Sequence, residues 1–154
     1  MNRWTRLAVG AAVLPVLLAG TGMTHGAQNA DAQRAAPQKA AAQKAGEQWL
    51  ALVDAGKYPE SWDAASQAFK DAVTKKDWVD SVKGARDPAG EVTSRRLTKA
   101  DLMKNPPNAP PGDYVGMTYQ SSFAKLGAAA ETVVMLLDKD GKWRLDGYYV
   151  QKAQ

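Results

Sequence analysis

Five polar residues in the second half of the chain have side chains suited to chemistry: Arg86, Arg95, Tyr119, Glu131 and Asp146. Glu131 alternates with Val133 and Met135, so we expect it on the same face of a strand as these apolar side chains. A partly buried carboxylate needs a cation or hydrogen-bond donors close by. Arg95, on a neighbouring predicted strand, could supply them.

Three roles remain open for this set. The first is structural, an ion pair between Glu131 and an arginine that ties a strand to a helix, because buried charges are normally paired. The second is binding of a small acidic or polar ligand, with an arginine contacting the anion. Its candidate residues are Arg86, Arg95, Tyr119 and Glu131. The third is acid–base catalysis by a lyase or isomerase without histidine, in which Glu131 or Asp146 works with Tyr119.

The composition excludes several kinds of site. The 154 residues include no Cys, and the one His is His25. His25 lies in a segment that we expect to be removed, which leaves neither residue type in the mature chain. That excludes a Ser-His-Asp triad, a cysteine nucleophile, disulfides and metal sites built on His or Cys. Asp138 and Asp140 lack the further oxygen ligands of a calcium loop, so no metal or other cofactor is expected.

The N-terminal segment predicts export. Arg3 and Arg6 precede an apolar run over Leu7–Gly20, and small and polar residues follow. This pattern is typical of a secretory signal peptide, here expected over residues 1–27 with cleavage between 22 and 32. The apolar run is shorter than the roughly 20 residues that a spanning helix needs. We therefore expect a periplasmic or secreted bacterial protein, with no stable membrane insertion after cleavage.

The charge distribution bears on the partners. The chain has 20 Lys+Arg and 16 Asp+Glu, and losing Arg3 and Arg6 with the leader lowers the net charge from +4 to +2. Charges of both signs are interspersed without a basic stripe, so we do not expect nucleic acid as a partner. An unidentified ligand or protein of the cell envelope is the expected partner, and a homodimer is compatible with the sequence.

Helical patterns fill the first half of the mature chain. Residues 28–41 are rich in Ala and Gln and lack large apolar side chains, so we predict a flexible tether there. Thr74, followed by Asp77, resembles a capping box at the start of a helix. Apolar residues at helical spacing predict three helices, over about residues 40–55, 59–73 and 75–85.

Strand patterns fill the second half. Alternating or apolar segments predict strands over about residues 91–97, 114–123, 129–137 and 143–150. A proline-rich loop is expected over 102–112 and a hairpin turn over 138–141. Helices followed by antiparallel strands predict one α+β domain over residues 42–151, with the helices on one face of a curved sheet. The four tryptophans of the mature chain are expected in its core, with ligand stacking as the alternative: Trp49, Trp62, Trp78 and Trp143.

Several segments, in order, carry a family resemblance. They are Trp49–Tyr58, Ser61–Asp63, Trp78, Arg86 with Pro88 and Gly90, Ser94–Arg95, Tyr119–Gln120, Glu131–Val133 and Asp138–Arg144. Together they resemble the family catalogued as domain of unknown function 4019 (DUF4019), over about residues 42–150. The resemblance implies a small exported bacterial protein and brings no established activity or site residue. The order of elements also resembles nuclear-transport-factor-2-like and cystatin-like architectures, which is a statement about fold alone.

These observations favour one function over two others. We expect a small exported, non-catalytic binding or accessory module of the cell envelope, with a shallow pocket between helices and sheet. A protein-interaction or self-association domain is the alternative. The histidine-free acid–base enzyme is the third hypothesis.

Overall fold

The computed structural model describes residues 25–153, with side chains from residue 33 onward. The signal peptide predicted over residues 1–27 lies almost wholly outside the described residues. Within them, helices precede strands, which confirms the predicted α+β class. The elements are α1 (His25–Asp54), α2 (Tyr58–Asp63), α3 (Gln67–Ala72), α4 (Lys75–Ala89), β1 (Val92–Lys104), β2 (Asp113–Phe123), β3 (Gly127–Leu137) and β4 (Trp143–Lys152).

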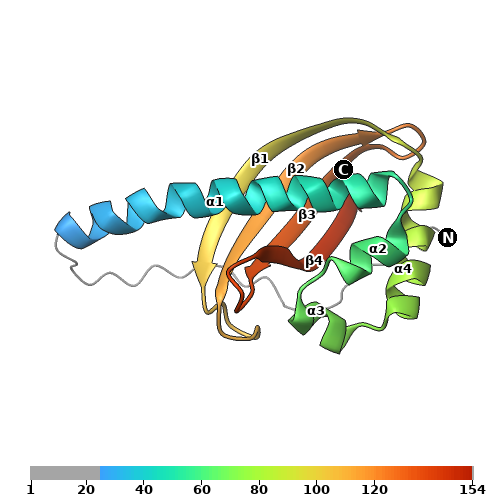
Figure 1. Ribbon diagram of the computed structural model, residues 1–154. Coiled ribbons are helices and arrows are strands. Elements are labelled where there is room, and N and C mark those ends of the chain that lie inside the picture. Colours follow the sequence, from blue (N-terminus) through green and yellow to red (C-terminus); the bar gives the residue numbers. More distant parts are fainter. Residues whose placement is uncertain (1–24, 154) are drawn as a thin grey trace.

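The strands form one antiparallel sheet in the order β1-β2-β3-β4, so each strand pairs with the next one along the chain. The sheet curves around α1, which crosses it and contacts all four strands (Figure 1). The shorter helices α2, α3 and α4 gather at the end of the sheet where α1 ends (Figure 1). No helix in the described part of the chain has the length and apolar character needed to cross a membrane.

A glycine of α1 lies against the sheet at a close contact. The buried face of α1 includes Ala42, Gly46, Trp49 and Val53. A Cβ atom placed on Gly46 would lie 2.6 Å from Cε of Met117 on β2, well inside van der Waals contact. A small Cβ could be accepted only if the flexible end of the Met117 side chain moved, and a larger side chain would overpack the contact.

Aromatic side chains fill the core at the end where α1 meets α4. The rings of Trp49 and Tyr148 have centroids 5.1 Å apart, and those of Phe69 and Trp78 lie 5.3 Å apart, both edge to face. Trp49 and Trp78 are each 3% exposed, which confirms the expected core position for these two. The other two tryptophans, Trp62 and Trp143, are half-buried against this core.

The single helix predicted over residues 59–73 is wrong, because the chain forms α2 and α3 with a break between them. Ser66 explains the break. Its hydroxyl accepts a hydrogen bond from the backbone N–H of Phe69 at 3.0 Å and so caps α3. Its own backbone N–H donates to the carbonyl of Leu145 on β4 at 2.7 Å. A contact with a distant strand thus converts a helix-interior position into an N-cap.

Residues 28–41, predicted as a flexible tether, are helical and belong to α1. Ala, Gln and Lys have high helix propensity, and this outweighs the lack of large apolar side chains. The helix continues through Pro37, although proline removes one backbone donor. As a result α1 extends beyond the edge of the sheet (Figure 1).

Other boundaries differ in extent. The helix expected to end at residue 85 runs to Ala89, and the first strand, expected over 91–97, runs to Lys104. The predicted proline loop over 102–112 therefore begins only at Asn105.

The N-cap at Thr74 is confirmed, since its Oγ1 accepts a hydrogen bond from the backbone N–H of Asp77 at 3.2 Å.

The close approach at Gly46 gives a stability prediction. We expect Gly46→Leu to lower the free energy of unfolding by about 1–3 kcal/mol, because the added side chain overpacks the contact with β2. Gly84→Ala on α4 is the matched control, because a Cβ there meets nothing within 4 Å. It should raise stability by about 0.5–1 kcal/mol through helix propensity. Urea unfolding measures both, and an unchanged stability of Gly46→Leu would contradict the packing argument.

Candidate functional site

Charged and polar side chains meet where α1, α4 and the inner face of the sheet come together. One comes from α1, one from α4 and one from each strand. We call this set the polar cluster: Asp54, Arg86, Arg95, Ser121, Glu131 and Tyr148. Glu131 is 0% exposed and Arg86 is 5% exposed, whereas the side chains of Arg95 and Asp54 are 16% and 31% exposed. The cluster therefore extends from the interior to the surface beside the end of α1.

Glu131 is the central acceptor of the polar cluster. Its Oε1 accepts from the hydroxyl of Tyr148 at 2.6 Å and from the guanidinium groups of Arg86 and Arg95 at 3.1 Å each. Its Oε2 accepts from Oγ of Ser121 at 2.5 Å and from Nε of Arg95 at 2.7 Å. These donors lie on four different elements. The hydrogen bonds of this one buried carboxylate thereby connect β3 to α4, β1, β2 and β4.

Asp54 binds the outer side of both guanidinium groups. Its Oδ1 accepts from Nη2 of Arg86 at 2.6 Å and from Nη2 of Arg95 at 3.0 Å, while its Oδ2 accepts from Nη1 of Arg95 at 2.6 Å. Each arginine thus bridges two carboxylates, and the two cations balance the two anions. Asp54 ends α1, where the helix dipole disfavours an acid, so the arginines also compensate the charge of this helix end.

Arg95 reaches Glu131 across an intervening strand. The prediction that Arg95 lies on a strand next to that of Glu131 is wrong, because β2 lies between β1 and β3. In register, Arg95 pairs with Ser121, and Ser121 pairs with Ala129. Both of these side chains are small, which leaves space over β2 for the long arginine side chain.

Arg86 enters the cluster from the apolar face of α4. Trp78, Val82 and Arg86 follow one another at four-residue spacing, and all three are buried. Because α4 runs to Ala89, Arg86 belongs to this helical face rather than to a turn. Its guanidinium carbon lies 4.8 Å from the ring centroid of Phe123, a favourable cation–π geometry.

The interior side of the cluster is apolar and aromatic. The ring of Tyr148 packs against Trp49 and, with centroids 6.4 Å apart, against Trp78. Burial raises the pKa of the Tyr148 hydroxyl well above its ordinary value, and the charge of Glu131 raises it further. Tyr148 therefore keeps its proton and remains a donor to Glu131.

The acids of the polar cluster are held in their charged form. Burial by itself raises the pKa of Glu131, but hydrogen bonds from Arg95, Ser121 and Tyr148 outweigh it, so the pKa lies below the ordinary value. The pKa of Asp54 is likewise lowered, because hydrogen bonds and charge from Arg95 outweigh partial burial. Both carboxylates are ionised at neutral pH and accept hydrogen bonds from the donors of the polar cluster.

Two residues of the predicted set lie outside the polar cluster. Tyr119 pairs with Glu131 in register, but its hydroxyl donates to Sδ of Met117 at 3.6 Å. Burial, followed by the charge of Glu47, raises the pKa of Tyr119 to about 12. Asp146 accepts a hydrogen bond from Ser66 Oγ at 2.6 Å, at the break between α2 and α3. The acid–base hypothesis requires Glu131, Tyr119 and Asp146 to converge on a common point. Their side chains do not do so.

The ion pair predicted between a strand glutamate and an arginine is confirmed, because Glu131 on β3 pairs with Arg86 on α4 at 3.1 Å and with Arg95 at 2.7 Å. Within residues 33–153, no buried side-chain nitrogen or oxygen lacks a hydrogen-bond partner. The ligand-binding role of Arg86, Arg95, Tyr119 and Glu131 stays a prediction. Both guanidinium groups already bind Asp54 and Glu131, so an anion there would compete with these carboxylates.

Sequence reasoning missed three members of the cluster, although each left a signal. Ser121 continues the inward alternation of β2 and is a polar residue among apolar ones. Asp54 is an acid in the last turn of a helix, where it needs a compensating cation. The alternation of β4 indicates an inward position for Tyr148 less clearly, because the pairing of β3 with β4 shifts register near Met135.

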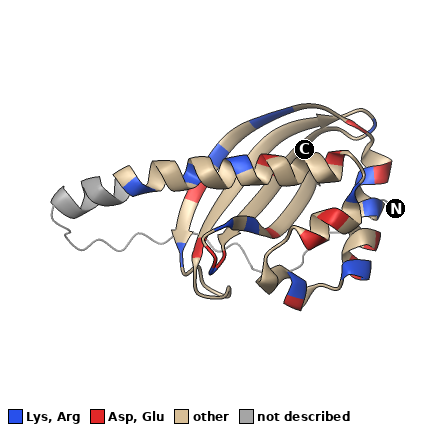
Figure 2. Ribbon diagram, viewed as in Figure 1, with Lys and Arg blue, Asp and Glu red and all other residues tan. Residues whose placement is uncertain are grey.

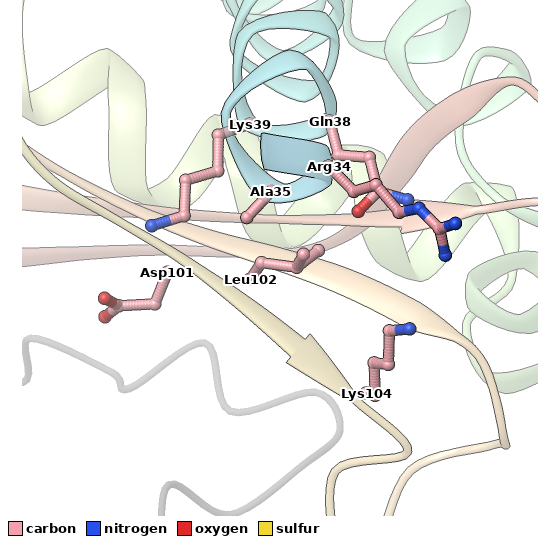
Figure 3. A pocket seen from close by; sticks show the side chains of 7 residues that line it. All are labelled: Arg34, Ala35, Gln38, Lys39, Asp101, Leu102 and Lys104. Atoms are coloured by element: carbon pink, nitrogen blue, oxygen red, sulfur yellow. The ribbon is translucent and has the colours of Figure 1, made fainter. Parts of the chain in front are cut away.

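A groove of about 450 Å³ lies between α1 and the C-terminal end of β1 (Figure 3). Its lining residues are Arg34, Ala35, Gln38, Lys39, Asp101, Leu102 and Lys104. Leu102 lies between the charged side chains, and Ala35 faces it from the helix (Figure 3). Sequence reasoning placed no site here, because it interpreted residues 28–41 as a tether and 102–112 as a loop.

The groove is basic and the polar cluster is neutral. Figure 2 shows basic positions along α1 and on β1, and positions of both signs on the shorter helices. Three of the lining residues are cations, against one acid, Asp101, which itself pairs with Lys99 at 2.8 Å. Among the residues with described side chains, no group of acidic, His or Cys side chains could hold a metal ion.

A family model described as a protein of unknown function (DUF4019) matches residues 45–148, more than half of the chain. The chain belongs to the DUF4019 family. No curated protein and no solved structure matches it. The DUF4019 match includes every residue of the polar cluster, from Asp54 to Tyr148. Of the groove it includes only the β1 side, because Arg34 to Lys39 precede residue 45.

The polar cluster predicts different costs for removing two buried tyrosine hydroxyls. Tyr148→Phe should lower the free energy of unfolding by about 1–3 kcal/mol, because Glu131 loses a donor and Arg86 an acceptor. Tyr119→Phe is the matched control, equally buried on the same face, and should cost less than about 1 kcal/mol. Urea unfolding compares the two variants. Equal losses would contradict the central position of Tyr148.

The lowered pKa values predict sensitivity to acid. A carboxylate whose pKa is lower in the folded than in the unfolded chain stabilises the fold above its ordinary pKa, and this contribution is lost as pH falls through the folded value. Below about pH 4–5, we expect the free energy of unfolding to decrease as pH falls. The decrease should be about 1.4 kcal/mol per pH unit for each additional proton bound on unfolding. Asp54→Asn should have a shallower slope in urea unfolding measured from pH 7 to 3. An unchanged slope would contradict the assignment.

Proposed function

We propose that this DUF4019 protein is an exported, non-catalytic binding or accessory module of the bacterial cell envelope. The groove between α1 and β1 carries the proposal, because it is a basic hollow of about 450 Å³ lined by side chains of both elements. Small-molecule sites usually have volumes of about 300–1,000 Å³. The basic, apolar and small-residue pattern of the N-terminal segment supports export.

The polar cluster supports a structural rather than a chemical use of its ionisable groups. A general acid or base needs a proton that can move at neutral pH and room for a substrate within hydrogen-bond reach. Glu131 and Asp54 have lowered pKa values, and their oxygens are bound to arginine, serine and tyrosine donors. We therefore place ligand binding in the groove and assign the cluster to maintaining the fold.

Export is tested on the full chain expressed in a bacterial host, by cell fractionation and by the mass of the recovered protein. We expect the protein in the periplasm or medium, with its N-terminus between residues 22 and 32. Replacing Arg3 and Arg6 with Glu is the matched control, because it removes the basic start and should retain the precursor in the cytoplasm. Cytoplasmic protein with an intact N-terminus would overturn the envelope location.

Binding is tested by a thermal-shift screen of the purified protein against envelope sugars, peptides and organic anions. A ligand at 100 times its Kd should stabilise the protein by about 2.7 kcal/mol and raise its Tm by several degrees. Light scattering on the same sample shows whether the protein self-associates. A stable dimer that responds to no ligand would favour the self-association alternative over the binding module.

A further inference from the structure

The arginine in the groove differs from the other arginines of the described chain. Arg86 and Arg95 bind carboxylates in the polar cluster, Arg144 binds Asp138 and Asp140, and Arg96 donates to the side chain of Gln120 at 2.6 Å. Arg34 has no such partner among the residues with described side chains. Lys39 and Lys104, in the same groove, also lack an acidic partner there. The groove thus gathers three cations that no acidic side chain among residues 33–153 neutralises.

The positions of these cations define one end of the groove. Figure 3 shows Arg34 and Lys104 on the same side of Leu102, with the amide of Gln38 beside Arg34. Lys39 and Asp101 lie on the other side of Leu102 (Figure 3). One end therefore presents two positive charges and an amide, and the other end presents one charge of each sign. An apolar surface separates them.

We propose that this groove binds a phosphate ester, with the phosphate at Arg34 and Lys104 and the organic group over Leu102. This names the ligand class of the proposed binding module and rests on that function. A phosphate carries a charge near −2 and oxygens that point in several directions, so it matches two cations that approach from a helix and from a strand. A carboxylate carries one charge and is satisfied by the fork of a single arginine.

The size and lining of the groove limit the organic part. A volume of about 450 Å³ fits a small ester or a lipid headgroup and not a folded protein. Leu102 offers apolar contact, while Lys39 and Asp101 can bind hydroxyl groups at the far end. Two sources of such an ester share this chemistry, a soluble metabolite and a phospholipid headgroup, and the experiment below separates them.

The test is calorimetric titration of the full chain with glycerol 3-phosphate, and with acetate as the carboxylate comparison. We expect saturable binding of the phosphate ester that weakens as salt increases, because the contacts are charged and exposed. Arg34→Gln and Lys104→Gln should each weaken binding about tenfold, the usual effect of losing one charge-assisted contact. Lys44→Gln, on the same helix outside the groove, should change it less than about twofold.

Sedimentation with phosphatidylglycerol vesicles identifies the source. Sedimentation that is lost in Arg34→Gln assigns a lipid headgroup, and binding of glycerol 3-phosphate without sedimentation assigns a soluble ester; both support the proposal. Equal binding by wild type and Arg34→Gln, binding of acetate as tight as that of the ester, or no binding of either form would overturn it. All the substituted residues lie outside the buried core, so unchanged unfolding midpoints verify the fold.

The two proposals can fail separately. If Arg34→Gln leaves phosphate binding unchanged while the thermal-shift screen finds another ligand, the groove assignment fails and the binding module stands. If the protein stays in the cytoplasm and no ligand stabilises it, the binding module itself fails.

Discussion

Burial of the Glu131 carboxylate is the constraint on which the rest of the structure depends. A charge removed from water needs compensation by donors and cations. Here the donors come from α4, β1, β2 and β4, and Asp54 at the end of α1 binds the outer side of the arginines. Since each partner lies on a different element, the charge is compensated only when helices and sheet are in their final arrangement.

A buried ion network does not by itself make a fold more stable, because desolvation offsets much of the attraction. The apolar core supplies the favourable free energy, through the aromatic rings of Trp49, Trp78 and Tyr148 and the close contact at Gly46. What the network adds is discrimination among arrangements. A shifted strand or helix would leave Glu131 or Arg86 buried without a partner, at a cost of several kcal/mol.

The polar cluster and the groove divide the charged residues of the domain into two kinds. In the cluster, two arginines and two carboxylates neutralise one another, and their side chains are fixed by mutual hydrogen bonds. In the groove, Arg34 and Lys104 lie on one side of Leu102 and are exposed. The fixed, neutral network restricts how helices and sheet can be arranged. Cations around a hollow without acidic partners attract anions from solution. The polar cluster and the proposed binding groove lie at opposite ends of α1.

Local patterns in the sequence determined the α+β class, the order of elements and the strand alternation, because each follows from residues close together in the chain. The pairing of Glu131 with arginine followed from the rule that buried charge is compensated. Tertiary contacts decided the rest. Ser66 breaks a helix because β4 lies beside it. Tyr148 on β4 binds Glu131, whereas the hydroxyl of Tyr119 on β2 contacts Met117. The groove exists only because α1 extends over the end of β1, a juxtaposition of residues about 65 positions apart that no local pattern encodes.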